Sequence, residues 1–268
     1  MKRIAFFSAA SIAASLTARA SVSFYDNFDS YTNGNLAGTT QNGFGQGTWQ
    51  QDNTSTATPI QINNGAVAIG TSGQDIYSAL TTPITLTDGS SFYIGLTVNV
   101  SAAQATGDYF LHWSTPAGTT TTFQERLFIR SSGSGFQFGY ATTGGGTTAY
   151  GTPVLNFGQS YQLVLAYNDV SGTANDTFSL YVNPTDLTTE GNNTAYMTSG
   201  FVGTGSEQTT VSAIDFRQGS ATQAPTLTAD NLAVGTTFAD VSNVPEPSAA
   251  ALGIVGGLAG LVIWKRRK

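Results

Sequence analysis

The chain of 268 residues has no cysteine and a single histidine, His112. Without cysteine there is no disulfide, no thiol nucleophile and no thiolate metal site. One histidine also excludes a zinc site built from several imidazoles. The fold must therefore rely on its hydrophobic core.

Positive charge is almost missing from the middle of the chain. Between residues 21 and 244 the only cations are Arg126, Arg130 and Arg217, against fifteen carboxylates, a formal charge of −12. Such a segment repels phosphate backbones, which argues against nucleic acid as a partner. It suits a soluble exterior, and it could attract calcium or other cations.

The other cations lie at the two ends, and those near the N-terminus precede an apolar stretch. Lys2 and Arg3 come before residues 4–16, which are mostly small and apolar, and Ala18 and Ala20 flank Arg19 in an A-x-A pattern. This order predicts a signal peptide over residues 1–20, removed by signal peptidase. A first core helix is the alternative, but the stretch is short and rich in serine.

The C-terminus carries a second uncharged run, residues 249–264. As a helix it would be about 24 Å long, against a bilayer core of about 30 Å. Trp264 and the aliphatic parts of the basic side chains that follow it can reach the membrane interface and make up for the short length. We therefore expect one transmembrane helix. A basic cluster follows this run: Lys265, Arg266, Arg267 and Lys268. The positive-inside bias keeps the cluster in the cytoplasm and the preceding domain outside. The alternative is a buried helix at the end of a soluble domain. It is disfavoured because the four cations would then lie next to the apolar end of that helix.

Pro245, Glu246 and Pro247 precede that run, and the order of the three parts resembles the PEP-CTERM sorting signal of Gram-negative bacteria. The prolines favour an extended, accessible backbone before the membrane. The resemblance covers about residues 244–268 and places a sorting-signal segment at residues 242–268. It implies export, anchoring in the inner membrane, processing by an exosortase-type enzyme, and delivery to the cell envelope or extracellular matrix. A lipid-anchor signal, the alternative, would normally end in its apolar run rather than in a basic cluster.

The segment between the two ends has turn residues every ten or so positions and alternating apolar runs. We expect strands at 91–100, 109–114, 122–130, 135–141, 161–167, 176–182, 211–216 and 226–234. In the first of these, Phe92, Ile94, Leu96 and Val98 share one face. Residues 168–175 read as a hairpin-like loop. No stretch of eighteen residues has the helical period, so the predicted fold is all-β, with two antiparallel sheets packed face to face.

Three phrases of the sequence resemble the concanavalin A-like jelly roll, the superfamily of laminin G domains and legume lectins. They are SVSFYDNFDSY from residue 21, YQLVLAYN and DTFSLYVNPTDL from residues 161 and 176, and DNLAVGTTFADV from residue 230. The resemblance implies one jelly-roll domain over residues 21–241, with the last strand returning beside the first. A shared fold does not carry a function with it.

Catalytic signals are sparse. Hydrolases of that superfamily use an E-x-D-x-x-E pattern on one strand, and Glu125, Glu190 and Glu207 do not fit it. Glu125 reads as a solvent-face charge or an ion-pair partner. Strand alternation places His112 on the face of Phe110, and no nucleophile elbow accompanies it. We therefore expect no catalytic residues.

Two kinds of binding site remain. Asp169, Asn175 and Asp176 supply hard oxygen ligands around a glycine-containing loop, so calcium is the one cofactor that the sequence indicates, although these residues also form ordinary turns. A second such cluster is Asp26, Asp29, Asn33 and Asn35. For sugars, the candidate aromatic platforms are Trp49, Trp113, Tyr140 and Tyr150.

The sequence thus predicts an exported, non-catalytic surface or matrix protein that binds or mixes with extracellular polysaccharide. A carbohydrate-active enzyme with an atypical site and a calcium-stabilised adhesion module are the alternatives.

Overall fold

The computed structural model describes residues 22–39, 45, 47–52, 58–114, 124–142, 147–201 and 207–243. The predicted signal peptide with Ala18 and Ala20, Pro245 to Pro247, the apolar run 249–264 and the basic cluster 265–268 lie outside the described residues. Within the described ranges, no helix has the length and apolarity to cross a bilayer.

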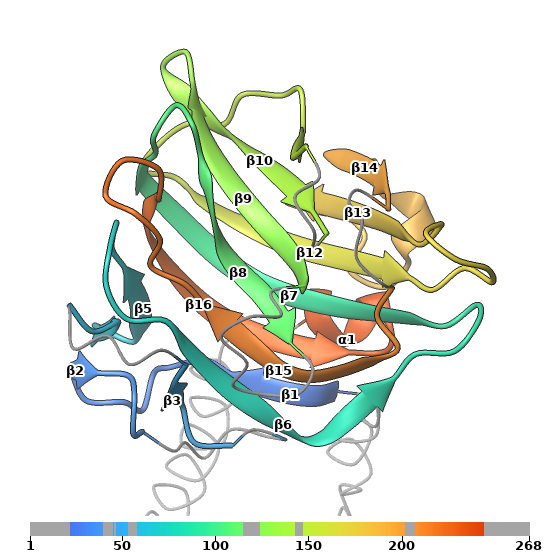
Figure 1. The fold of residues 1–268 in the computed structure, drawn as a ribbon, viewed down its shortest axis with the longest axis horizontal. Helices are drawn as coiled ribbons and strands as arrows, with labels where there is room; N and C mark the ends of the chain where they lie inside the picture. Colours follow the sequence, from blue (N-terminus) through green and yellow to red (C-terminus); the bar gives the residue numbers. More distant parts are fainter. Residues whose placement is uncertain are drawn as a thin grey trace, which may run out of the picture.

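The described chain folds into two antiparallel sheets, as predicted (Figure 1). Nine strands form the first sheet. Eight follow the order β14 (Met197–Gly200), β13 (Thr177–Val182), β12 (Ser160–Asn168), β7 (Ser91–Ala102), β16 (Thr226–Gly235), β5 (Ala66–Ile69), β4 (Gln61–Asn63) and β2 (Gly34–Asn35), and β1 (Val22–Asp26) also pairs with β16.

Seven strands form the second sheet. Their order is β11 (Ala149–Tyr150), β10 (Gly135–Ala141), β9 (Gln124–Ser132), β8 (Asp108–Ser114), β15 (Thr210–Phe216), β6 (Ile76–Thr85) and β3 (Gln50–Gln51). All eight predicted strands are present, and the predicted loop 168–175 joins the antiparallel pair β12 and β13.

The core lies between the sheets and draws on both of them. Phe92, Ile94, Leu96 and Val98 of β7 are buried in it, as their alternation predicts. The Phe92 ring meets the edge of Trp113 of β8, with centroids 4.8 Å apart and planes at 87°. Because side chains of one sheet pack directly on side chains of the other, the two sheets form a single sandwich.

The last long strand returns beside the first, as the jelly-roll resemblance implies. β1 pairs antiparallel with β16, and Phe24 lies opposite Val234 while Asp26 lies opposite Leu232. Figure 1 shows β1 in blue and β16 in orange, the first and last strands of the described chain, close together. Two segments about two hundred residues apart in sequence thus pair with each other in this sheet.

One short helix, α1 (Phe238–Ser242), covers part of the outer face of the nine-stranded sheet. Thr237 and Asp240 cap its start with a reciprocal capping box. Phe238 packs edge-on against Tyr93 and Tyr181, with ring centroids 6.1 Å and 5.4 Å away. The helix lies so close that a Cβ on Gly95 of β7 would come 2.1 Å from the Val241 carbonyl oxygen.

Strand β8 departs from the predicted alternation. Its pairing with β9 shifts between Tyr109 and Leu111, a bulge that places both Phe110 and Leu111 in the core. His112 therefore does not share a face with Phe110, and that prediction is wrong. A bulge adds one residue to the strand and resets the alternation after it.

Candidate functional site

The outer face of the seven-stranded sheet carries every cation of the described chain. Arg126 and Arg130 alternate along β9 with Leu127 and Ile129, which are fully buried, so the arginines point away from the core. Arg217 follows β15 directly. We call the surface formed by Tyr109, Arg126, Phe128, Arg130, Gln137, Tyr150 and Arg217 the arginine face.

Tyr109 lies at the centre of this face. Its ring centroid is 4.1 Å from the guanidinium carbon of Arg217 and 5.3 Å from that of Arg126. The Phe128 ring lies 5.4 Å from Tyr109 and 5.5 Å from the Arg126 guanidinium carbon. Burial raises the pKa of the Tyr109 hydroxyl to about 12. The ring therefore stays neutral and holds two guanidinium groups by cation–π contact.

A second arginine and aromatic pair lies at the other end of β9. The guanidinium carbon of Arg130 is 3.9 Å from the ring centroid of Tyr150. Its Nε and Nη2 donate to Gln137 Oε1 at 3.1 Å and 3.0 Å, and Gln137 Nε2 donates to the Thr152 carbonyl at 3.2 Å. These bonds fix the plane of the Arg130 guanidinium.

A glycine makes room for the Tyr150 ring. A Cβ at Gly139 of β10 would lie 2.5 Å from Tyr150 Cδ1. The ring can therefore lie against the strand backbone only because no side chain is there.

The three arginines differ in how their charges are balanced. Arg217 pairs with two carboxylates, since its Nη1 is 2.8 Å from Asp108 Oδ1 and its Nε is 3.8 Å from Asp75 Oδ2. Burial raises the pKa of Asp75 to about 6, while the backbone amide of Gln218 and the charge of Arg217 act against that rise. In the described ranges no carboxylate forms an ion pair with Arg126 or Arg130. Arg126 and Arg130 therefore differ from Arg217 in having no carboxylate in direct contact within the described ranges.

His112 and Asp215 lie fully buried side by side on neighbouring strands, with 3.7 Å between His112 Nδ1 and Asp215 Oδ2. Burial lowers the pKa of His112 to about 3 and raises that of Asp215 well above its usual value. Ser114 Oγ donates to Asp215 Oδ2 at 2.9 Å. A serine nucleophile would instead have to hydrogen-bond to the histidine, so this trio lacks the order of a hydrolytic triad.

Glu125 is buried, contrary to the expectation of a solvent-face charge. It has a φ of +49° and accepts a hydrogen bond from the Tyr140 hydroxyl. Strand alternation places Glu125 on the same face as Leu127 and Ile129, and burial there raises the pKa of its carboxyl well above the usual value.

Three of the four predicted aromatic platforms are wrong. Trp49, Trp113 and Tyr140 are 0%, 1% and 2% exposed and belong to the core, and only Tyr150 lies on the surface. Tyr140 continues the row of Phe136 and Phe138 along β10, a signal present in the sequence. The arginine face had a signal too, because Arg126 and Arg130 occupy alternate positions of one predicted strand.

Two of the predicted calcium ligands, Asn175 and Asp176, form hydrogen bonds with other groups in and beside the loop. Asp176 Oδ1 accepts the Val170 amide at 2.8 Å, and its Oδ2 accepts the Tyr167 hydroxyl. Asn175 Nδ2 donates to the Ser171 carbonyl at 2.9 Å. The pKa of the Asp169 carboxyl is raised, mainly by burial and to a smaller extent by the charge of nearby Asp176. Across the described ranges, no three Asp, Glu or His side chains converge as a metal site would require.

The second predicted cluster is also held by hydrogen bonds. Asp26 is fully buried and accepts from Phe28 N, Tyr31 Oη and Trp49 Nε1. Asp29 accepts from Asn27 Nδ2, and Asn33 Oδ1 accepts from the Asn64 amide. Asp26 thus works as a structural anchor for the first turn.

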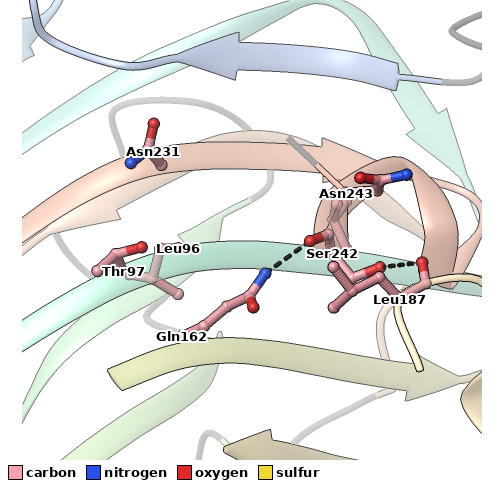
Figure 2. Close-up of a pocket in the computed structure, with 8 residues that line it drawn as sticks. Leu96, Thr97, Gln162, Leu187, Asn231, Ser242 and Asn243 are labelled. Atoms are coloured by element: carbon pink, nitrogen blue, oxygen red, sulfur yellow. Dashed lines mark hydrogen bonds between the residues drawn. The ribbon is translucent and has the colours of Figure 1, made fainter. Parts of the chain in front are cut away.

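The nine-stranded sheet has a hollow of its own, of about 250 Å³, at the C-terminal end of α1. Figure 2 shows Gln162 donating to the Ser242 carbonyl, at 2.6 Å, while Ser242 Oγ donates to the Leu187 carbonyl, at 2.6 Å. The lining holds amide, hydroxyl and aliphatic groups and no titratable side chain; it consists of Leu96, Thr97, Gln162, Leu187, Asn231, Val241, Ser242 and Asn243. It offers fewer recognition groups than the arginine face.

No protein-family model matches the chain, and no curated protein matches its sequence. Similar solved structures include the globular domain of T. cruzi calreticulin (9% identity, 92% of this chain and 100% of that chain, TM-score 0.46). They also include the Emp47p carbohydrate recognition domain (10%, 81% and 97%, TM-score 0.46) and the alginate lyase vAL-1 from a Chlorella virus (7%, 72% and 92%, TM-score 0.42). Both a binding domain and an enzyme occur among them, and all three TM-scores are below 0.5. The chain's function must therefore be argued from its own geometry.

Proposed function

We propose that the chain is a non-catalytic, glycan-binding protein and that the arginine face is its binding surface. The observation that carries the proposal is the pairing of guanidinium groups with aromatic rings, Arg126 and Arg217 at Tyr109 and Arg130 at Tyr150. The rings position the guanidinium groups, whose N–H groups donate to the hydroxyl oxygens of a sugar, and the partly exposed Phe128 ring offers apolar contact to its C–H face. Both kinds of group are held in place by the protein before any ligand binds.

The titratable groups near this face support binding rather than turnover. Glycoside hydrolysis requires two carboxyl groups free to act as acid and as base or nucleophile. Asp75 and Asp108 are instead ion-paired with Arg217, and His112 and Asp215 are closed off from solvent. Within the described chain, this surface therefore presents no pair of carboxyl groups that could act on a bound glycan as acid and base.

Retention of the full-length chain, purified in a non-ionic detergent, on a panel of immobilised polysaccharides tests this proposal. We expect binding to at least one polysaccharide, and Tyr150→Ala should weaken it about tenfold by removing the ring that supports Arg130. Tyr25→Ala removes a half-buried tyrosine from the nine-stranded sheet and serves as the control. Equal losses in the two variants, or no retention on any polysaccharide, would refute the proposal.

We further propose that the two-sheet sandwich is a concanavalin A-like jelly roll carried to the cell surface or extracellular matrix by its ends. Signal peptidase would cut after Ala20, and the apolar run 249–264 would hold the chain in the inner membrane. An exosortase-type enzyme would then act near Pro245, Glu246 and Pro247, with the basic cluster 265–268 left on the cytoplasmic side. The order of these segments in the sequence supports this route.

Intact-mass analysis of the protein isolated from its native cell envelope tests the route. The expected product begins at Ser21 and lacks the residues beyond the proline pair. A chain that still begins at Met1 and ends at Lys268, recovered from the cytosol, would contradict it.

A further inference from the structure

We infer that the glycan bound by the arginine face is an acidic polysaccharide, whose carboxylate groups pair with Arg126 and Arg130. This inference rests on the proposed glycan-binding function and narrows it to one class of ligand.

The distribution of charge is the first argument. The described residues hold three cations and fifteen carboxylates, and all three cations lie on one face of one sheet. A neutral glycan would need no such concentration, because its hydroxyl groups bond equally well to amides and hydroxyls. An anionic ligand, by contrast, is attracted directly by this concentration of positive charge.

The state of each guanidinium is the second argument. Arg217 is already paired with Asp108 and Asp75, so its charge is neutralised. Arg126 donates through Nη2 to the Thr142 carbonyl, and Arg130 donates to the Gln137 side-chain oxygen; both acceptors are neutral. Both side chains are partly exposed, and a guanidinium keeps its proton in proteins. They therefore offer two positive charges that no carboxylate of the described residues holds in an ion pair.

The spacing of the two charges is the third argument. Arg126 and Arg130 are four residues apart on one extended strand, about 13 Å at the usual rise of a β-strand. Phe128 lies between them and is also partly exposed. A single acidic sugar would reach one guanidinium only. A polymer can place anionic groups on both and an apolar ring face on Phe128, and the second contact then forms within the same complex.

The acidity of the rest of the domain does not oppose this binding at physiological salt. Exposed charges are screened over about 8 Å at that ionic strength. Direct guanidinium–carboxylate pairs are shorter than this distance and are screened less. The other carboxylates would instead discourage an acidic polymer from adhering elsewhere on the molecule.

The test compares three polysaccharides in biolayer interferometry with the full-length chain in non-ionic detergent. They are polygalacturonate, the same polymer fully methyl-esterified and therefore neutral, and a sulfated galactan. We expect polygalacturonate to bind at least tenfold more tightly than its ester. Arg126→Gln and Arg130→Gln should each weaken that binding about tenfold, and Arg130→Lys should weaken it less.

Thr228→Glu is the matched control, because it lowers the net charge by the same one unit on an exposed position of β16, in the other sheet. It should change the affinity less than twofold, and all variants should still unfold cooperatively on heating. Equal binding of polygalacturonate and its ester would overturn the inference while leaving the proposed glycan binding intact. So would a preference for the sulfated galactan, or arginine variants that behave like Thr228→Glu. If none of the three polymers binds and the wider panel also fails, the proposed function itself falls.

Discussion

Asp26 shows how much of the fold can depend on one buried carboxylate. It is fully buried at the end of β1 and accepts the Phe28 amide at 3.0 Å, the Tyr31 hydroxyl at 2.7 Å and the Trp49 indole N–H at 2.9 Å. Removing it would strand the Trp49 donor in the core. Buried donors left without an acceptor cost about 1–3 kcal/mol each, and hydrogen bonds to charged groups contribute about 1.5–3 kcal/mol.

We therefore expect Asp26→Ala to lower the free energy of unfolding by about 3–5 kcal/mol in chemical denaturation. Asp26→Asn keeps one acceptor oxygen and should lose less. A loss below about 1 kcal/mol for the alanine variant would mean that the carboxylate is not the anchor described above.

His112 makes stability depend on pH. Its ring is fully buried, and burial lowers its pKa to about 3, whereas an unfolded histidine takes up a proton near pH 6.5. Below pH 6.5 the unfolded chain therefore binds a proton that the folded chain does not, which favours unfolding. The wild type should lose stability relative to His112→Asn as the pH falls from 6.5 towards 4, by roughly 1.4 kcal/mol per pH unit. A constant difference between the two proteins over this range would contradict the buried, neutral histidine.

At the scale of elements, helix α1 depends on the absence of a side chain in the strand below it. Gly95→Ala would place a Cβ 2.1 Å from the Val241 carbonyl oxygen, so helix or strand must move. We expect a loss of about 1–3 kcal/mol and faster hydrogen exchange of the α1 amides. Gly200→Ala, at a strand position where a Cβ meets nothing within 4 Å, is the control and should cost little. Equal effects of the two substitutions would refute the close packing of α1.

The elements also show what the sequence could and could not predict. Strand β10 matches its prediction at both ends because large apolar residues alternate with small or polar ones without interruption. Strand β6 was missed since Ser78, two threonines and Pro83 break its pattern, and α1 was missed because five residues are too few to display a helical period. The buried position of Glu125 follows from its alternation with Leu127 and Ile129, so the sequence did contain that signal, whereas the bulge in β8 follows from backbone geometry that residue types do not reveal.

Only part of the arginine face could be predicted from the sequence. That Arg126 and Arg130 share a face follows from their spacing on one strand. Their meeting with Tyr109, Tyr150 and Arg217 depends on the order of strands β11, β10, β9, β8 and β15, which arises from pairings far apart in sequence. Sequence periodicity carries no information about that order.

At the scale of the whole molecule, the proposed anchor and the proposed binding surface belong to different sheets. The nine-stranded sheet carries α1, and the chain leaves the domain from that helix towards the predicted membrane segment. The arginine face belongs to the other sheet. An anchored molecule would thus present the arginine face away from the attachment point.

This arrangement predicts that anchoring leaves glycan binding unchanged. The full-length chain in lipid nanodiscs and the same chain after proteolytic release between residues 244 and 248 should bind polygalacturonate with Kd values within twofold of each other. At least tenfold weaker binding in the nanodisc would indicate that the membrane covers the face.

The most direct test of the central claim is a chemical-shift map of the isotopically labelled chain during titration with an acidic oligosaccharide. The account predicts shifts at the Nε–H groups of Arg126 and Arg130 and at backbone amides of β8, β9, β10 and β11, with β7, β12 and β16 unchanged. Shifts confined to the nine-stranded sheet, or no shifts at saturating ligand, would contradict it.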